Sequence, residues 1–236
     1  MIESLFRYPI KSMRGERVTA IALGWDGLVG DRQLGVRRKH DRSDFPWLSA
    51  TKVPDLCRFT PEGEDGPAEL PTHVRTCDGA RFPLYSDELA DDLARRCGEP
   101  VEVMRLRHGI FDDAPVSLIT TTTVGELCRL GGVADEVQRF RTNVVIRSQR
   151  AVPFEENDWV GATIRFGTGD DAASVAIAMC SVRCAVINND PTGGPMTPAL
   201  LKAAVRANDN NAGVAATVTR TGRLEVGMPI LLDRGR

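Results

Sequence analysis

The sequence predicts a mainly β protein with short helices, an α+β fold, on three observations. Short runs of β-branched and apolar residues, bounded by Gly, Asp or Pro, recur along the chain. Helical periodicity is confined to three short segments. The composition, 42% apolar and 26% charged, is typical of a globular protein. A chain of 236 residues can bury a sizeable core, so we expect one or two domains.

Six segments have the composition and length of strands. They are residues 18–22, 33–36, 143–146, 163–166, 174–179 and 216–220. The sequence Arg-Thr-Gly-Arg at 220–223 indicates a hairpin turn, which leads into a last strand that ends near Leu232.

Three segments predict helices. Residues 87–97 place leucines at helical spacing and end before Gly98, a common stop signal. Residues 124–130 follow Thr123, which has the capping-box spacing to a glutamate three residues on. Residues 198–206 begin with a proline at the first turn.

Two segments break this pattern. Residues 61–69 are acidic and rich in Gly and Pro, which predicts a surface loop. Residues 107–115 are the best candidate for a linker. We therefore predict a boundary near residue 105, with domains at 1–105 and 106–236.

Several classes of protein are disfavoured. The net charge of −2 gives no global sign of nucleic-acid binding. The N-terminus has no secretory signal, and no apolar run is long enough for a membrane span, so we expect a cytoplasmic protein with no membrane partner. In that compartment the six cysteines should be free thiols. The three histidines lie far apart, which argues against a zinc site.

The most informative segment runs from Cys180 to Cys184, where an apolar run gives way to a polar, Gly-rich stretch. A thiol at a strand-to-loop boundary beside Arg183 tends to ionise, and thiolates are nucleophiles and soft metal ligands. The simpler interpretation is that Cys184 is an inert, half-buried thiol. From the residues alone, these alternatives stay open.

Cations stand in two further motifs. Lys11 and Arg32 each lie beside small or turn-forming residues, so each is either a ligand contact or a solvated surface cation. In residues 139–143, strand alternation would put Arg139, Arg141 and Asn143 on one face, as a ligand contact or as an edge strand with salt bridges.

The glutamates in residues 153–159 are predicted to be solvated, with Trp159 as a packing anchor.

Taken together, these motifs resemble the MOSC superfamily over nearly the whole chain. No single motif is specific, but their order is. They are Tyr-Pro-Ile-Lys-Ser at 8–12, Gly-Asp-Arg at 30–32, Ala-Pro-Val-Ser-Leu-Ile at 114–119, Arg-Phe-Arg-Thr-Asn at 139–143, Pro-Phe-Glu-Glu-Asn-Asp-Trp at 153–159, Arg-Cys at 183–184, Asp-Pro-Thr-Gly at 190–193 and Val-Gly-Met-Pro-Ile at 226–230. The resemblance implies an N-terminal MOSC β-barrel domain followed by a C-terminal MOSC β-barrel domain.

Within the superfamily, the chain is similar to the mitochondrial amidoxime-reducing component and its bacterial relatives. This implies a molybdenum cofactor (molybdopterin carrying Mo), with Cys184 as the metal ligand and catalytic residue. The cofactor-binding residues that it implies are Lys11, Ser12, Arg32, Arg141, Asn143, Arg183 and Cys184. At superfamily level, pyridoxal phosphate binding is implied as well. Two departures stand out: Val182 is inserted before Arg183, and Thr142 replaces a frequent proline.

The implied function is the reduction of small N-hydroxylated substrates by a molybdenum-dependent oxidoreductase. The chain carries no iron–sulfur domain, so we expect a separate electron-donor protein. The alternative is a carrier without redox chemistry, which delivers the cofactor or holds sulfur as a persulfide on Cys184. A third possibility is an interaction module that has lost cofactor binding.

Overall fold

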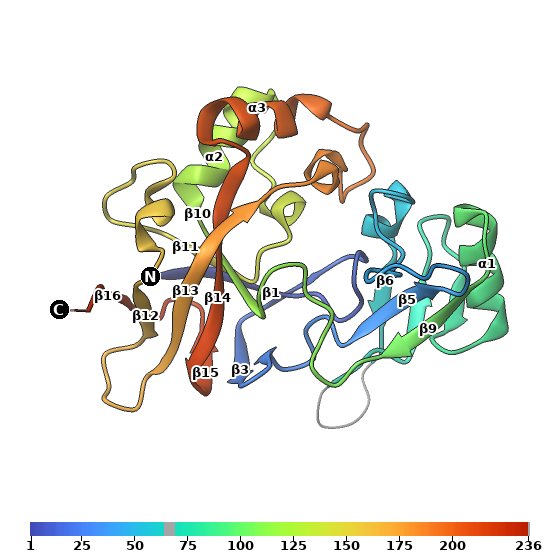
Figure 1. Cartoon of the computed structure of the whole chain (residues 1–236), viewed down its shortest axis with the longest axis horizontal. Coiled ribbons are helices and arrows are strands. Elements are labelled where there is room, and N and C mark those ends of the chain that lie inside the picture. Colours follow the sequence, from blue (N-terminus) through green and yellow to red (C-terminus); the bar gives the residue numbers. More distant parts are fainter. Residues whose placement is uncertain (64–68, 236) are drawn as a thin grey trace.

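The computed structural model describes residues 1–63 and 69–235, and confirms a mainly β fold with short helices. Its largest element is a curled eight-stranded sheet in the order β16-β12-β13-β14-β10-β11-β1-β2 (Figure 1). Its strands are β1 Ile2–Arg7, β2 Glu16–Val18, β10 Val116–Thr120, β11 Val144–Ile146, β12 Thr163–Phe166, β13 Ala173–Val182, β14 Asn211–Arg220 and β16 Ile230–Asp233. Neighbouring strands are antiparallel except β10 and β11, which pair in parallel with Leu118 opposite Val144.

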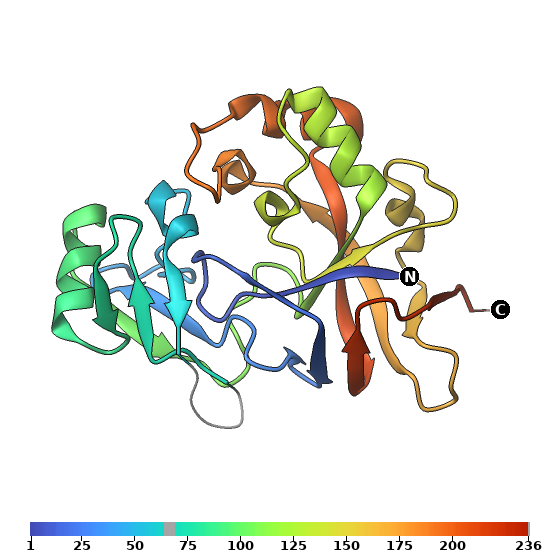
Figure 2. The ribbon, with the colours of Figure 1, turned by 180° about the vertical axis from the view of Figure 1, so that it is seen from behind.

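Three smaller sheets, β15-β3-β4, β5-β9 and β6-β7-β8, complete the β-structure of the described residues. Their strands are β3 Ala20–Gly24, β4 Gly27–Leu28, β5 Leu34–Arg38, β6 Thr60–Glu62, β7 His73–Arg75, β8 Arg81–Pro83, β9 Val101–Arg105 and β15 Gly222–Glu225. The α-helices are α1 Asp87–Cys97, α2 Thr121–Gly131 and α3 Pro198–Asn208. Short 3-10 helices are η1 Pro54–Arg58, η2 Val137–Phe140, η3 Glu155–Trp159 and η4 Ala185–Asn188. Figure 2 shows α1 at the end of the molecule opposite the two chain termini.

The centre of the large sheet is buried on both faces. On β1, Leu5 belongs to one apolar cluster and Phe6 to another, because successive side chains point to opposite faces of a strand. The first cluster also contains Trp159, which confirms its predicted role as a packing anchor. The second lies under α2 and α3. Burial of both faces explains why these strands read as continuous apolar runs.

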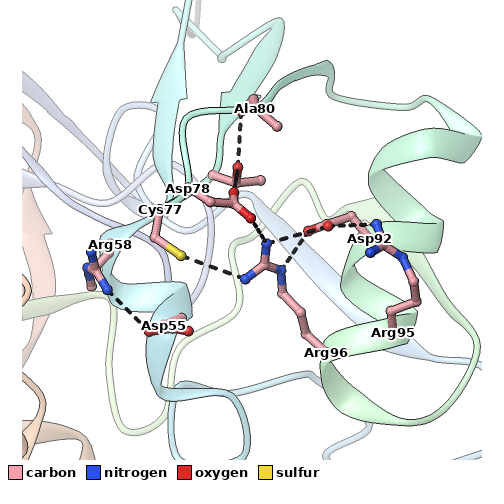
Figure 3. Close-up of polar contacts among 9 residues, drawn as sticks. Asp55, Arg58, Cys77, Asp78, Ala80, Asp92, Arg95 and Arg96 are labelled. Atoms are coloured by element: carbon pink, nitrogen blue, oxygen red, sulfur yellow. Dashed lines mark hydrogen bonds and ion pairs between the residues drawn. The ribbon is translucent and has the colours of Figure 1, made fainter.

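A third apolar cluster lies under α1, β5 and β9. Arg96 ties the end of α1 to the turn between β7 and β8, as Figure 3 shows. It donates to Asp92 at 2.7 Å and to Asp78 at 2.8 Å, and approaches the Cys77 sulfur at 3.7 Å. These contacts fix α1 against the small β6-β7-β8 sheet.

The predicted helices are all present, with some shifted starts. α1 has the predicted bounds, and Gly98 ends it in a left-handed conformation. α2 begins three residues before the expected start, because the Thr120 hydroxyl caps it by accepting from the Thr123 amide. α3 begins as predicted at Pro198 and continues two residues beyond the expected end.

Two local predictions are wrong. The turn at 220–223 does not form a hairpin, because β15 leaves β14 and pairs with β3, where Leu224 lies opposite Ile21. The predicted last strand is therefore divided into β15 and β16. The predicted acidic loop at 61–69 is wrong at its start, because residues 61 and 62 belong to β6, and its residues 64–68 lie outside the described residues.

The segments on either side of residue 105 share the large sheet, since β1 and β2 extend it beyond β11. A domain boundary near residue 105 stays a prediction. None of the helices in the described chain combines the length and hydrophobicity needed to cross a membrane.

Candidate functional site

A cavity of about 340 Å³ lies where loops of the first 51 residues meet residues from the later part of the chain. The predicted site residues come from four separate segments of the sequence, and the structure brings all of them to the wall of this cavity. They are Lys11, Ser12, Arg32, Arg141, Asn143, Arg183 and Cys184.

Backbone hydrogen bonds join the first two motifs. The amide of Arg32 donates to the Tyr8 carbonyl at 2.7 Å, and the amide of Lys11 donates to the Leu34 carbonyl at 2.8 Å. The buried carboxylate of Asp31 accepts from the Tyr8 amide at 2.7 Å. Asp31 therefore holds together the two loops that carry the cations.

Three cavity residues have left-handed backbone conformations that non-glycine residues rarely adopt. The φ angles are 69° at Ser12, 49° at Arg32 and 52° at Arg141. Each such residue costs about 1–3 kcal/mol, so surrounding contacts must hold it in place. Residues in these conformations cluster at ligand sites, which supports the choice of this cavity.

Lys11 is 5% exposed, so its interpretation as a solvated surface cation is wrong. Its Nζ donates to Asp112 at 2.9 Å and lies 4.8 Å from the centre of the Phe45 ring. Burial lowers the pKa of Lys11, and the nearby Asp112 opposes that shift. The ion pair keeps a positive charge at the cavity wall.

Arg32 has a side chain that is 13% exposed, so it is not a solvated cation either. Its guanidinium pairs with Asp31 at 2.5 Å and donates to the Arg141 carbonyl at 2.7 Å. Burial acts to lower the pKa of Arg32, but the charge and hydrogen bond of Asp31, together with Tyr8 and Asp112, outweigh it and the pKa is raised. Arg32 is therefore a fixed, permanent cation.

The predicted strand alternation over residues 139–143 is wrong. η2 ends at Phe140, Arg141 turns the chain, and β11 begins only at Val144. Arg139 forms an ion pair with Asp190 at 2.8 Å, as the salt-bridge alternative expected, but from a 3-10 helix rather than an edge strand.

Tyr8 contacts two of the guanidinium groups. Its ring centre lies 4.8 Å from Arg32 and 4.5 Å from Arg141, within cation–π range. Arg141 also donates from Nη1 to the Met13 carbonyl at 2.6 Å. Burial lowers the pKa of Arg141. The tyrosine ring thus attracts both positive charges.

Asn143 lines the cavity and also connects its walls. Its Oδ1 accepts from the Ser117 hydroxyl at 2.9 Å and from Arg32 at 3.3 Å, while its Nδ2 donates to the Phe6 carbonyl at 3.2 Å. These contacts hold Arg32 and Ser117 in place from the residue just before β11.

Cys184 follows the end of β13 by two residues and is exposed at the cavity, so the prediction that it is half-buried is wrong. The inserted Val182 is 65% exposed. Arg183 donates to the carbonyl of Phe140 at 2.8 Å and to that of Ala212 at 2.7 Å. Burial lowers the pKa of Arg183 to about 10, so its charge persists at neutral pH.

A β-bulge shapes this end of β13. Its partner strand β14 has one extra residue here, since Cys180 lies opposite Val214 while Val182 lies opposite Asn211. The bulge contains Gly213, with φ of +80°. Bulges are common next to functional sites because they re-aim side chains, and this one precedes Arg183 and Cys184.

The predicted solvation of the glutamates in 153–159 is wrong. Glu155 is 6% exposed and Glu156 is fully buried. Glu156 accepts from the hydroxyls of Thr123 at 2.9 Å and Thr120 at 3.1 Å, and burial raises its pKa. Glu156 is not among the residues that line the cavity.

Sequence reasoning missed several cavity residues. Asp112 and Asp113 lie in the predicted linker, and Phe45 comes from a loop without any motif. The only signal for the aspartates was their position just before the Ala-Pro-Val-Ser-Leu-Ile motif. Burial raises the pKa of Asp113, and the neighbouring Asp112 adds to the shift.

The donor set fits a cofactor with an anionic tail and a soft metal. Cations can hold phosphate oxygens, and the Cys184 thiol can supply the thiolate that a soft metal prefers. Within the described residues, no three His, Cys, Asp or Glu side chains are grouped to hold a metal ion by themselves. A metal here would therefore depend on Cys184 and on ligands that a cofactor brings.

Two family models match the chain. The model of the MOSC domain matches residues 71–231, and the model of the MOSC N-terminal beta barrel domain matches residues 1–83. The search of curated proteins gave no match.

The fold is also found among solved structures. The crystal structure of the YUAD protein from Bacillus subtilis is similar with a TM-score of 0.56 at 15% identity, over 100% of this chain and 96% of that chain. At this identity, the likeness concerns the fold alone. A second structure, of a hypothetical protein, has a TM-score of 0.46 at 10% identity and covers 99% of this chain and 66% of that chain, so it carries no argument.

Proposed function

Because the chain belongs to the MOSC family, whose domains bind the molybdenum cofactor or act in sulfur transfer to it, we propose that its cavity binds the molybdenum cofactor. The single observation that carries the proposal is the exposed Cys184 thiol at the wall of a cavity that Lys11, Arg32 and Arg141 also line. Cys184 would ligate the metal. The cations would hold the anionic tail.

We further propose that the protein reduces small N-hydroxylated substrates. The bound cofactor would supply the two-electron chemistry, in which an N–OH group, two electrons and two protons give N–H and water. The chain's own residues would orient the cofactor through Arg32 and Arg141. Electrons would come from a separate donor protein. Cytoplasmic location and pyridoxal phosphate binding remain predictions.

Reduction of benzamidoxime by the purified protein, with an artificial reductant, tests this function. The protein should be expressed in a host that makes the cofactor, and substrate loss should scale with bound molybdenum. We expect activity in the wild type and at least a hundredfold less in Cys184→Ala. Molybdenum-loaded protein without activity would contradict the reductase and leave the cofactor site standing.

A carrier function is the second candidate, and the exposure of Cys184 favours it, because a sulfur donor could reach the thiol. In that case, mass spectrometry would find a persulfide on Cys184 as a mass increase of about 32 Da, the mass of one sulfur atom. Benzamidoxime would then not be reduced. A persulfide-free, active protein would contradict the carrier.

A further inference from the structure

A second, much smaller cavity has Tyr8 in its wall and shares Arg139, Arg141 and Val186 with the cofactor site proposed above. Its volume is about 10 Å³. Eight buried side-chain atoms of the described residues have no hydrogen-bond partner, and four of them belong to residues that line this cavity. They are Tyr8 Oη, Gln138 Oε1, Arg139 Nε and Arg141 Nη2.

The grouping of these atoms needs an explanation. A buried donor or acceptor left without a partner destabilises a protein, and four such groups in the residues around one cavity would strongly destabilise a marginally stable fold. Buried water molecules satisfy such groups, each making two to four hydrogen bonds in a space of about 10–15 Å³. The cavity volume lies at the lower edge of that range.

We propose that this cavity binds one structural water molecule, and that Tyr8 and Gln138 act through it as positioning residues for Arg141. A water molecule accepts two hydrogen bonds and donates two. Here it would accept from Arg139 Nε–H and Arg141 Nη2–H, and donate to Gln138 Oε1 and Tyr8 Oη. The four unpaired groups therefore match the bonding capacity of one water molecule.

Arg141 needs such support, because it lines both cavities and few other contacts fix it. Its Nη1 donates to the Met13 carbonyl at 2.6 Å, and its guanidinium lies 4.5 Å from the Tyr8 ring centre. Burial raises the pKa of Tyr8 to about 12, so the phenol stays neutral and can share in the hydrogen bonds. The water would fix the second nitrogen and so orient the guanidinium at the large cavity.

Water fits this cavity better than an anion does. The Gln138 oxygen is an acceptor and would repel an anion. The charge of Arg139 is already neutralised by Asp190 at 2.8 Å.

Gly15 also lines this cavity and packs against Tyr8. A Cβ atom at residue 15 would lie 2.3 Å from the tyrosine ring, so only glycine leaves the ring in place.

A crystal structure of the protein at better than about 1.8 Å, with a parallel bromide soak, tests the site itself. We expect a density peak within about 2.6–3.2 Å of the four atoms and no bromide anomalous signal there. Absence of the peak, or bromide bound in its place, would overturn the proposal. Neither result depends on the molybdenum cofactor.

The positioning role has its own readout, the exchange of the two Arg141 Nη groups measured by ¹⁵N NMR. Tyr8→Phe removes one partner of the water, so we expect this exchange to accelerate about tenfold or more. Tyr85→Phe is the matched control, because Tyr85 is 65% exposed and does not line the small cavity. If Tyr8→Phe does not fold, Gln138→Leu removes a different partner with the same expected result. Unchanged exchange in a folded variant of either kind would overturn the role.

Discussion

At the scale of single residues, close contacts around Gly213 determine how the end of β13 is arranged. A Cβ atom on Gly213 would lie 2.4 Å from the Leu118 carbonyl oxygen and 3.1 Å from Arg183 Nη2. The residue also has a left-handed backbone. Both facts follow from the bulge that precedes Cys184, so a glycine is needed for the site to form.

We expect Gly213→Ala to lower the free energy of unfolding by about 2–4 kcal/mol, from backbone strain plus the clash with β10. Gly98→Ala is the matched control: it has a φ of +81°, but a Cβ there meets nothing within 4 Å, so it should cost only about 1 kcal/mol. Urea denaturation of both variants measures the difference. Equal losses of unfolding free energy in the two variants would show that the close contact at Gly213 does not contribute to stability.

Among the site residues, those in motifs were predictable and those in loops were not. Lys11, Arg32 and Cys184 stand in short motifs whose order carried the resemblance. Asp112 gave no such signal, because its role depends on its contact with Lys11, 101 residues away in sequence. Contacts of that kind arise from the tertiary fold, which local patterns do not encode.

At the scale of elements, the buried Glu156 ties η3 to the start of α2. Its carboxylate accepts from both Thr120, the cap of α2, and Thr123 in its first turn. Burial raises the pKa of Glu156 above its ordinary value of 4.5. The stability that this group contributes is therefore fully present below pH 4.5 and is lost as the pH rises through the folded-state pKa.

Glu156→Gln cannot ionise, so the unfolding free energy of this variant should fall less than that of the wild type as the pH rises from 4.5 to 8. The measurement is chemical denaturation across that range. Glu126→Gln is the control. A hydrogen bond from Arg129 lowers the pKa of Glu126, whereas burial raises the pKa of Glu156, so the control should not show the same change in pH dependence. A Glu156→Gln profile parallel to the wild type would contradict a buried, perturbed carboxylate.

Element types were easier to predict than their pairing. The strand at 163–166 and the helix at 87–97 were found with their observed bounds, since periodicity is local. The prediction of a hairpin at 220–223 was wrong because turn residues do not specify which strand the next segment pairs with, and β15 pairs with β3. Residues 139–143 failed because a 3-10 helix of four residues leaves almost no periodic signal.

At the scale of the whole molecule, the two parts of the chain complete one another. β1 lies between β11 and β2, and the main apolar cluster takes Leu5 and Leu23 from the start of the chain and Val144 from the later part. The large cavity is likewise lined from both parts. Stability and the site should therefore both depend on contacts made across residue 105.

We expect a fragment of residues 106–236 to stay unfolded alone, because it would expose the edge of β11 and the apolar surface that Ile2, Leu5, Ile21, Leu23 and Leu28 cover in the main cluster. Co-expression with residues 1–105 should restore a folded complex. Amide dispersion in ¹H–¹⁵N spectra distinguishes the two states. A well-dispersed spectrum from the isolated fragment would contradict this dependence.

The most direct test of the cofactor site is the ratio of molybdenum to protein in Cys184→Ala, measured by mass spectrometry of the metal after expression in a cofactor-competent host. Cys180→Ala is the matched control, because Cys180 belongs to the same segment but does not line the cavity. We expect wild type and Cys180→Ala to carry molybdenum at a similar ratio, and Cys184→Ala to lose at least about nine tenths of it. Full retention of molybdenum in Cys184→Ala would contradict ligation by that sulfur.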